Sequence, residues 1–166
     1  MVSTQLLKEL PLFAGLTEDE LKSLSAICQE KELKNGEIVF TEGSAANELF
    51  ILEAGAINVQ LKVAPYVDHL TVHTVTPKEI FGELAFIDDV PRSATTKCVK
   101  DSKVVIINQS EFEGLVKRYS HIGEVVYRNM AVTMSLRLRN ADKQIKEFWS
   151  KIFEAQSPAF AKMFVI

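Results

Sequence analysis

The sequence predicts an α+β fold that is mainly β: an antiparallel roll of short strands, with helices before it and one long helix after it. Two observations carry this prediction. Residues 36 to 107 alternate short apolar runs with turn residues, a spacing that is typical of antiparallel rolls and barrels. The segments on either side instead repeat apolar residues every three or four positions, as amphipathic helices do.

Composition places the chain among ordinary globular proteins. Its 166 residues are 47% hydrophobic and 25% charged, which suits one domain with a substantial core. A formal net charge of −3 argues against broad nucleic-acid binding, because that function normally needs a basic excess. The chain opens with no secretory signal pattern and holds no apolar stretch of membrane-spanning length, so we expect a cytoplasmic protein that does not bind membranes. Cys28 and Cys98 lie in no metal-like spacing and predict neither a disulfide framework nor a zinc site.

Helical spacing at residues 4 to 10 and 17 to 30 predicts two N-terminal helices. The second begins with Thr17 followed three residues later by Glu20, the pattern of a capping box. Proline and glycine within residues 10 to 16 break the helix between the two segments, and the apolar residues there are suited to closing the end of a barrel.

The strand region contains six runs with the composition of short strands, separated by turn residues. These runs cover residues 37–41, 48–52, 56–63, 69–75, 94–99 and 103–108.

Residues 81 to 95, which we call the cassette, combine the groups needed to hold a phosphorylated ligand. Gly82 allows the backbone to come close to a ligand, and residues 83 to 85 can begin a short helix whose free N–H groups attract an anion. Arg92 adds a planar cationic fork. The carboxylate of Glu83 would repel a phosphate, so we expect it to face another part of the ligand, such as a sugar hydroxyl. This division of roles indicates a nucleotide.

Phe-Gly-Glu-Leu-Ala at residues 81–85 and Pro-Arg-Ser-Ala-Thr at residues 91–95 resemble the phosphate-binding cassette of the cyclic nucleotide-binding domain family. That family includes the catabolite activator protein and the regulatory subunits of cyclic-AMP-dependent protein kinase. The resemblance covers roughly residues 5 to 140. It implies a β-roll or jelly-roll of about eight short strands, with N-terminal helices, a short cassette helix and a long C-terminal helix.

The resemblance also implies roles for individual residues. It implies that Glu83 holds the ribose 2′-hydroxyl, that Arg92 pairs with the cyclic phosphate, and that backbone N–H groups complete the anion site. Serine at position 93 favours cyclic AMP over cyclic GMP, because serine occurs there in the family's cyclic AMP binders. The expected ligand-binding residues are Phe81, Gly82, Glu83, Leu84, Ala85, Arg92, Ser93 and Ala94, with no catalytic residue and no metal site.

Residues 43 to 55 resemble a second motif of the family, with one departure. Ala45 and Ala46 stand near positions where the family commonly has a glycine and an acid. This departure keeps a second function open, in which a degenerate roll serves as a protein-interaction scaffold without nucleotide. Glu83 and Arg92 favour nucleotide binding, because a scaffold has no evident physical need for both.

The long C-terminal helix carries a heptad seam, which we define as Met134, Leu138, Ala141, Ile145, Phe148, Ile152 and Ala155. Its apolar residues alternate at intervals of three and four. Two interpretations are open: the seam joins two copies of the chain, or it packs on the chain's own roll. We favour a homodimer, because the family often dimerises through this helix. The predicted divisions are a binding roll at residues 1–120, a hinge and dimerisation helix at 121–155, and an apolar tail at 156–166.

Together these features predict a regulatory module that binds a cyclic nucleotide and moves its C-terminal helix. We expect no enzymatic activity, because no nucleophile–base pair or metal triad is evident in the sequence. The 11 residues after position 155 are too few for a helix-turn-helix, so we expect no direct DNA binding. The expected partners are a cyclic nucleotide, a second copy of the chain and an unknown downstream protein, with no cofactor.

Overall fold

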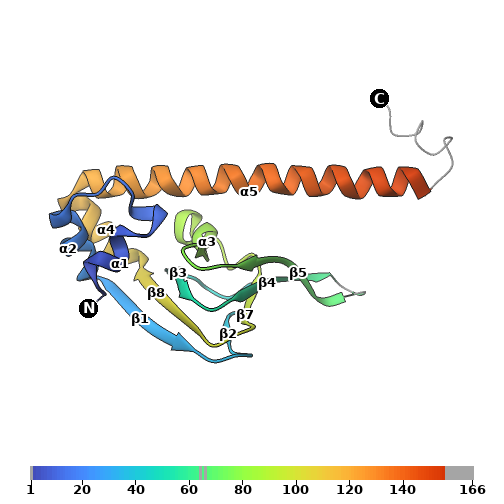
Figure 1. Ribbon diagram of the computed structural model, residues 1–166, viewed down its shortest axis with the longest axis horizontal. Helices are drawn as coiled ribbons and strands as arrows, with labels where there is room; N and C mark the ends of the chain where they lie inside the picture. The colour runs from blue at the N-terminus through green and yellow to red at the C-terminus, as the bar shows by residue number, and fades with distance from the viewer. Residues whose placement is uncertain (1, 64, 66, 156–166) are drawn as a thin grey trace. The chain divides into compact units, whose positions relative to one another are not determined.

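The computed structural model describes residues 2–63, 65 and 67–155 (Figure 1). The chain divides into two units, Met1–Asn129 and Met130–Ile166. The apolar tail that we predicted at residues 156–166 lies outside the described residues. Among the described residues, no helix combines the length and the hydropathy that a membrane-spanning segment needs.

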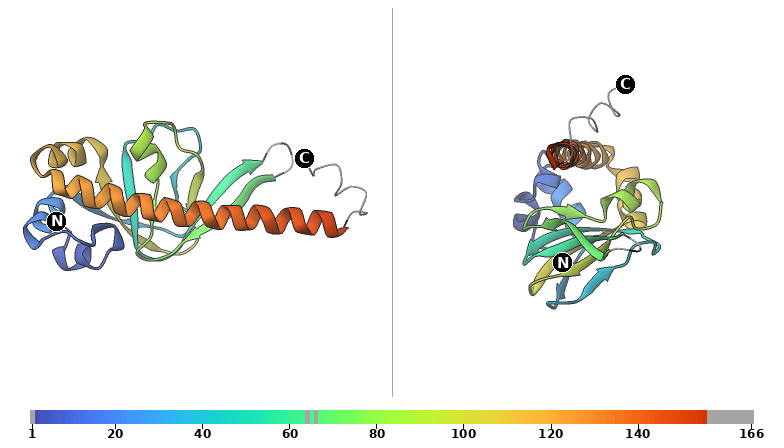
Figure 2. Two further views of the ribbon diagram at one scale, coloured as in Figure 1. Left: turned by 90° about the horizontal axis from the view of Figure 1, so that it is seen from above. Right: turned by 90° about the vertical axis from the view of Figure 1, so that its right-hand side faces the viewer.

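The N-terminal region of the first unit is helical. It contains α1 (Thr4–Lys8), the 3-10 helix η1 (Pro11–Phe13) and α2 (Glu18–Ser25). The predicted capping box is confirmed: the Glu20 backbone N–H donates to the Thr17 hydroxyl, and the Thr17 backbone N–H donates to the Glu20 carboxylate. With α4 (Gln109–Arg118), α1 and α2 gather at one end of the roll (Figures 1 and 2).

Eight strands in the described residues form two antiparallel four-stranded sheets, ordered β1-β8-β3-β6 and β2-β7-β4-β5. The predicted α+β roll is therefore confirmed. The strands are β1 (Cys28–Leu33), β2 (Ile38–Phe40), β3 (Glu48–Ala54), β4 (Ile57–Val63), β5 (Val67–Val75), β6 (Ile80–Phe81), β7 (Thr95–Cys98) and β8 (Ser102–Asn108).

The largest difference from the prediction lies at residues 17–30. Helical spacing predicted a helix from residue 17 to residue 30, but α2 ends at Ser25 and β1 begins at Cys28. Six residues of β1 pair with β8, from Cys28 opposite Ile107 to Leu33 opposite Ser102. This long-range pairing overrides the local helical pattern, because strand formation depends on the neighbouring strand more than on intrinsic preference.

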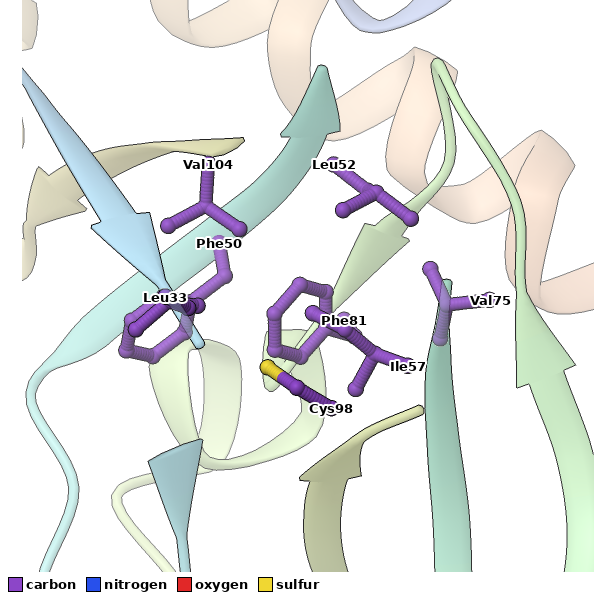
Figure 3. Close-up of a cluster of buried hydrophobic side chains, with 8 residues drawn as sticks. All are labelled: Leu33, Phe50, Leu52, Ile57, Val75, Phe81, Cys98 and Val104. Carbon is purple, nitrogen blue, oxygen red and sulfur yellow. The ribbon is translucent and has the colours of Figure 1, made fainter. Parts of the chain in front are cut away.

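The core lies between the two sheets, where buried apolar side chains from both converge (Figure 3). The Phe50 and Phe81 rings stack with their centroids 5.1 Å apart. Both cysteines are buried, and burial raises the pKa of the Cys28 thiol to about 12, which keeps that thiol protonated. The cluster consists of Leu33, Phe50, Leu52, Ile57, Val75, Phe81, Cys98 and Val104.

The long helix α5 (Ser120–Ala155) starts in the first unit and continues into the second. Within the first unit, its residues Ile122 and Val126 are buried. The side-chain amide of Asn129 donates hydrogen bonds to the carbonyl oxygens of Leu12 and Ala14, at 2.9 and 3.0 Å. The beginning of α5 is thereby fixed to the N-terminal helical region. The heptad seam is helical along its whole length, because all seven of its residues lie within α5.

Candidate functional site

The cassette forms the short helix that the sequence predicts. The helix α3 (Glu83–Asp88) follows β6 directly, and Gly82 between them takes the left-handed conformation with φ +75°. Glu83 and Ala85 are buried in the first turn, with Glu83 only 6% exposed, whereas Leu84 is 46% exposed. The first-turn N–H groups of a helix have no acceptors within the helix, so this turn presents donors next to Gly82.

Arg92 is buried beside this turn. The residue is 4% exposed, and its guanidinium donates to two backbone carbonyl oxygens: from Nη1 to Gly82 at 2.8 Å, and from Nη2 to Glu48 at 2.9 Å. Its Nε has no hydrogen-bond partner among the described residues. The Nε–H is therefore a buried donor without a partner, a condition that a bound anion would relieve.

An aromatic platform supports the guanidinium. The Arg92 Cζ atom lies 4.1 Å from the centroid of the Phe40 ring and 5.4 Å from that of Phe50. Phe40 in turn stacks on Phe81, with centroids 6.0 Å apart. These contacts orient the cation through its attraction to the ring faces. Phe81, which we predicted as a ligand-binding residue, lies in the core behind the cassette and belongs to this platform.

The charge of Arg92 persists in this setting. Burial lowers the pKa of the guanidinium from its ordinary value, and the carboxylates of Glu48 and Glu83 act in the opposite direction. Arginine is not deprotonated in proteins, so the group remains a cation at neutral pH. A buried cation that also carries an unsatisfied N–H is suited to binding an anion.

Gly82 is required by the position of Arg92. A Cβ atom at residue 82 would lie 2.4 Å from Arg92 Nη1 and 3.2 Å from Cε1 of Phe40. The sequence predicted that Gly82 allows the close approach of a ligand. The group that approaches it in the structure is the guanidinium, which fits against the glycine and binds its carbonyl.

The second motif holds the other end of the cassette. The backbone N–H of Gly43 donates to the Arg92 carbonyl at 2.8 Å, and the Arg92 N–H donates to the Ser44 carbonyl at 2.9 Å. These paired bonds fix the backbone of Arg92 without using the side chains of Ala45 or Ala46. After Arg92, Ser93 is exposed and Ala94 is buried.

Hydrogen bonds hold the C-terminal end of α3 to α4. The Gln109 side-chain amide donates to the Phe86 carbonyl at 3.1 Å and to Oδ1 of Asp89 at 2.6 Å. Asp89 ends α3 with φ +58°, a left-handed conformation that is unusual for a residue other than glycine. Asp88 accepts a bond from the Val90 N–H, so both aspartates have local structural roles, and within the described residues no metal-binding cluster is present.

The structure places Arg92 against Gly82 and within the electrostatic reach of Glu83, and it adds partners that sequence reasoning missed. Phe40 and the backbone carbonyl of Glu48 both contact Arg92, although they come from strands 44 or more residues earlier. Phe40 gave only an ordinary strand signal, and a backbone carbonyl gives no side-chain signal at all. Both partners follow from the arrangement of the strands.

Comparison with known proteins identifies the family. The profile of the cyclic nucleotide-binding domain matches residues 30–119, which is more than half of the chain and includes the whole cassette. The chain belongs to this family.

Relatives within the cyclic nucleotide-binding domain family include proteins of different kinds. The cyclic AMP receptor protein of Thermus thermophilus is 27% identical over 144 residues, which cover 84% of this chain and 62% of the receptor. Glutaminase 1 of Bradyrhizobium diazoefficiens is 31% identical over 139 residues, which cover 84% of this chain and 22% of the glutaminase. The chain therefore spans less than two thirds of the length of either relative.

A solved structure of the same family has a similar fold. The regulatory domain of Toxoplasma gondii cyclic-AMP-dependent protein kinase, crystallised with cyclic AMP, superposes with a TM-score of 0.62 at 27% sequence identity. The match covers 69% of this chain and 43% of the Toxoplasma chain.

Proposed function

We propose that this chain is a regulatory module that binds a cyclic nucleotide, with cyclic AMP bound more tightly than cyclic GMP. Nucleotide binding in turn changes the position of helix α5. The chain is a binding protein and not an enzyme. The observation that carries the proposal is the state of Arg92: a buried cation, held over an aromatic ring, whose Nε–H has no partner. Calorimetric titration of the nucleotide-stripped protein with both cyclic nucleotides tests this proposal.

The bound nucleotide is oriented by two opposite charges. Arg92 pairs with the cyclic phosphate, because a guanidinium forms strong charge-assisted hydrogen bonds with phosphate oxygens. The carboxylate of Glu83 accepts from the ribose 2′-hydroxyl, since a carboxylate repels phosphate but accepts readily from a hydroxyl. Backbone N–H groups of Leu84, Ala85 and Ser93 complete the anion site. Phe81, Gly82 and Ala94 shape the wall behind these groups.

The preference for cyclic AMP rests on Ser93 and on the relatives. Ser93 directly follows Arg92 and is exposed, so its hydroxyl is accessible beside the phosphate site. The family resemblance associates serine at this position with cyclic AMP. The Thermus relative is named for cyclic AMP, and the Toxoplasma domain was crystallised with it.

A chain of contacts inside the first unit links the cassette to α5. The centroid of the Phe86 ring in α3 lies 5.7 Å from that of Phe112 in α4, and the Phe112 and Tyr127 rings form a T-shaped pair with centroids 5.7 Å apart, which reaches α5. Gln109 adds the hydrogen bonds between α3 and α4 described above. A ligand shifts such a system only by binding one arrangement more tightly than another. We propose that nucleotide binding repositions α3. The ring contacts of Phe112 and the hydrogen bonds of Gln109 then move α4 and the start of α5.

We further propose that α5 joins two copies of the chain through the heptad seam. Replacing Leu138 and Ile145 together by aspartate should convert the dimer to a monomer, because two charges per helix would be buried in the interface. Light scattering coupled to gel filtration measures the change. Leu136→Asp is the matched control: the same residue type on the same helix, but off the seam, and it should stay dimeric.

Two outcomes would contradict this part of the proposal. A parent protein that is monomeric at micromolar concentration, or a Leu138→Asp, Ile145→Asp protein that remains dimeric, would exclude the seam as the interface. Hydrogen exchange tests separately whether nucleotide binding moves α5. Cyclic AMP should change the exchange rates of backbone amides within residues 122–155. Unchanged rates there would show that nucleotide binding does not affect α5.

A further inference from the structure

Thr96 lies in the middle of β7, and its side chain faces the interior of the roll. Its strand neighbours are Phe40 on β2 and Val59 on β4. Side chains alternate between the two faces of a strand, and Cys98, two residues along, is buried as Thr96 is. Lys97, between them, is exposed. Thr96 therefore belongs to the inner face of the sheet.

The hydroxyl of Thr96 is buried without a partner. The residue is 1% exposed, and its Oγ1 makes no hydrogen bond to any described residue. Ser25 and Ser102, the other buried hydroxyl residues in the described part of the chain, differ: Ser25 donates to the Val2 carbonyl, and Ser102 donates to the Lys100 carbonyl. A buried hydroxyl without a partner destabilises the folded protein, whereas a valine of nearly the same shape would not.

The position of Thr96 relative to Arg92 suggests what this hydroxyl is for. Arg92 Nε is likewise buried without a partner, and its guanidinium covers the ring of Phe40, the strand neighbour of Thr96. Neighbouring strands lie about 4.8 Å apart, so the backbone of Thr96 lies about one strand spacing from that of Phe40. The Phe40 ring in turn carries the guanidinium of Arg92. A nucleotide whose phosphate pairs with Arg92 is long enough to reach Thr96 with its base.

We propose that the Thr96 hydroxyl hydrogen-bonds the base of the nucleotide and is a specificity-determining residue of this site. The inference rests on the proposed binding of a cyclic nucleotide at Arg92. Base edges present both donors and acceptors, and a hydroxyl serves as either. The neighbouring side chain of Val59 on β4 supplies apolar surface beside the base. Because Thr96 is closed off from solvent, the bond forms only after the side chains that cover it move.

Thr96→Val tests the inference, because it removes the hydroxyl and keeps the shape. Two quantities are measured: the melting temperature without ligand, and the calorimetric Kd for cyclic AMP. The melting temperature should rise by about 2 to 4 °C, because the unsatisfied group is gone. Binding should weaken by about three- to tenfold, because the hydrogen bond to the base is lost.

Two further variants serve as controls. Thr96→Ser keeps the hydroxyl and should retain the parent's affinity to within about twofold. Thr74→Val removes an exposed hydroxyl whose partner is the Asn58 side chain, at 2.9 Å on β4, and should leave the affinity unchanged.

The outcomes separate this inference from the proposed function. A Thr96→Val protein that binds cyclic AMP as tightly as a binding-competent parent would overturn the inference alone. So would a lower melting temperature of Thr96→Val, because it would show that the hydroxyl has a structural partner. A parent that binds neither cyclic AMP nor cyclic GMP would contradict the proposed function itself, and the inference would be rejected with it.

Discussion

Replacing Arg92 by alanine should weaken cyclic AMP binding by roughly ten- to a hundredfold, because a hydrogen bond to a charged group contributes about 1.5 to 3 kcal/mol. The variant removes the buried cation that we propose to pair with the phosphate. It also removes the donors that bind the carbonyls of Gly82 and Glu48, so the cassette loses part of its own support. Calorimetry measures the loss of affinity, and a melting curve without ligand measures the loss of support.

Two comparisons isolate the contribution of the guanidinium. Arg92→Lys keeps the charge but loses the planar fork and its fit on Phe40, so its affinity should fall between those of the parent and the alanine variant. Lys97→Ala removes a positive charge from an exposed side chain on β7 and should bind as the parent does. An Arg92→Ala protein with the parent's affinity would show that the phosphate does not bind there.

Gly82→Ala should destabilise the protein and weaken nucleotide binding by about tenfold or more, approaching the effect of removing Arg92. Residue 82 has φ +75°, which strains any residue with a Cβ atom. The added Cβ would also lie 2.4 Å from Arg92 Nη1, so the guanidinium must leave its position. Calorimetry and thermal melting measure the two effects.

Gly36→Ala is the matched control for this substitution. Gly36 has φ +86°, and a Cβ there would meet no heavy atom within 4 Å. Its replacement should cost about 1 kcal/mol of stability from backbone strain and leave the affinity for cyclic AMP unchanged. If Gly82→Ala is no more destabilising than Gly36→Ala and binds equally well, the fit between Gly82 and Arg92 does not matter for the site.

The sequence predicts most of this fold because its strands and helices carry strong local patterns. It fails where a partner distant in sequence decides the structure. The spacing of residues 17–30 continues a helical pattern, and only the pairing of β1 with β8 turns residues 28–33 into a strand. The two-residue strand β6 exists through its pairing with Phe50 and Ile51 of β3 and is too short to show an alternation of its own.

In the candidate site, too, the local sequence predicts some residues, and others depend on partners distant in sequence. Gly82, Glu83 and Arg92 were predicted because their residue types and spacing suggest how a phosphorylated sugar is held. The platform under the guanidinium and the unsatisfied hydroxyl of Thr96 were not predicted, because each depends on which residues face one another across strands. Threonine is common in strands, and only its burial without a partner distinguishes Thr96 from an ordinary strand residue.

Binding of a cyclic nucleotide by the cassette is tested most directly by calorimetric titration of the nucleotide-stripped protein. We expect cyclic AMP to bind with a Kd of about 1 μM or tighter, which corresponds to about −8 kcal/mol, and cyclic GMP to bind more weakly. No heat of binding and no rise in melting temperature with either nucleotide would contradict the account. That result would favour the alternative that the roll is a protein-interaction scaffold without nucleotide.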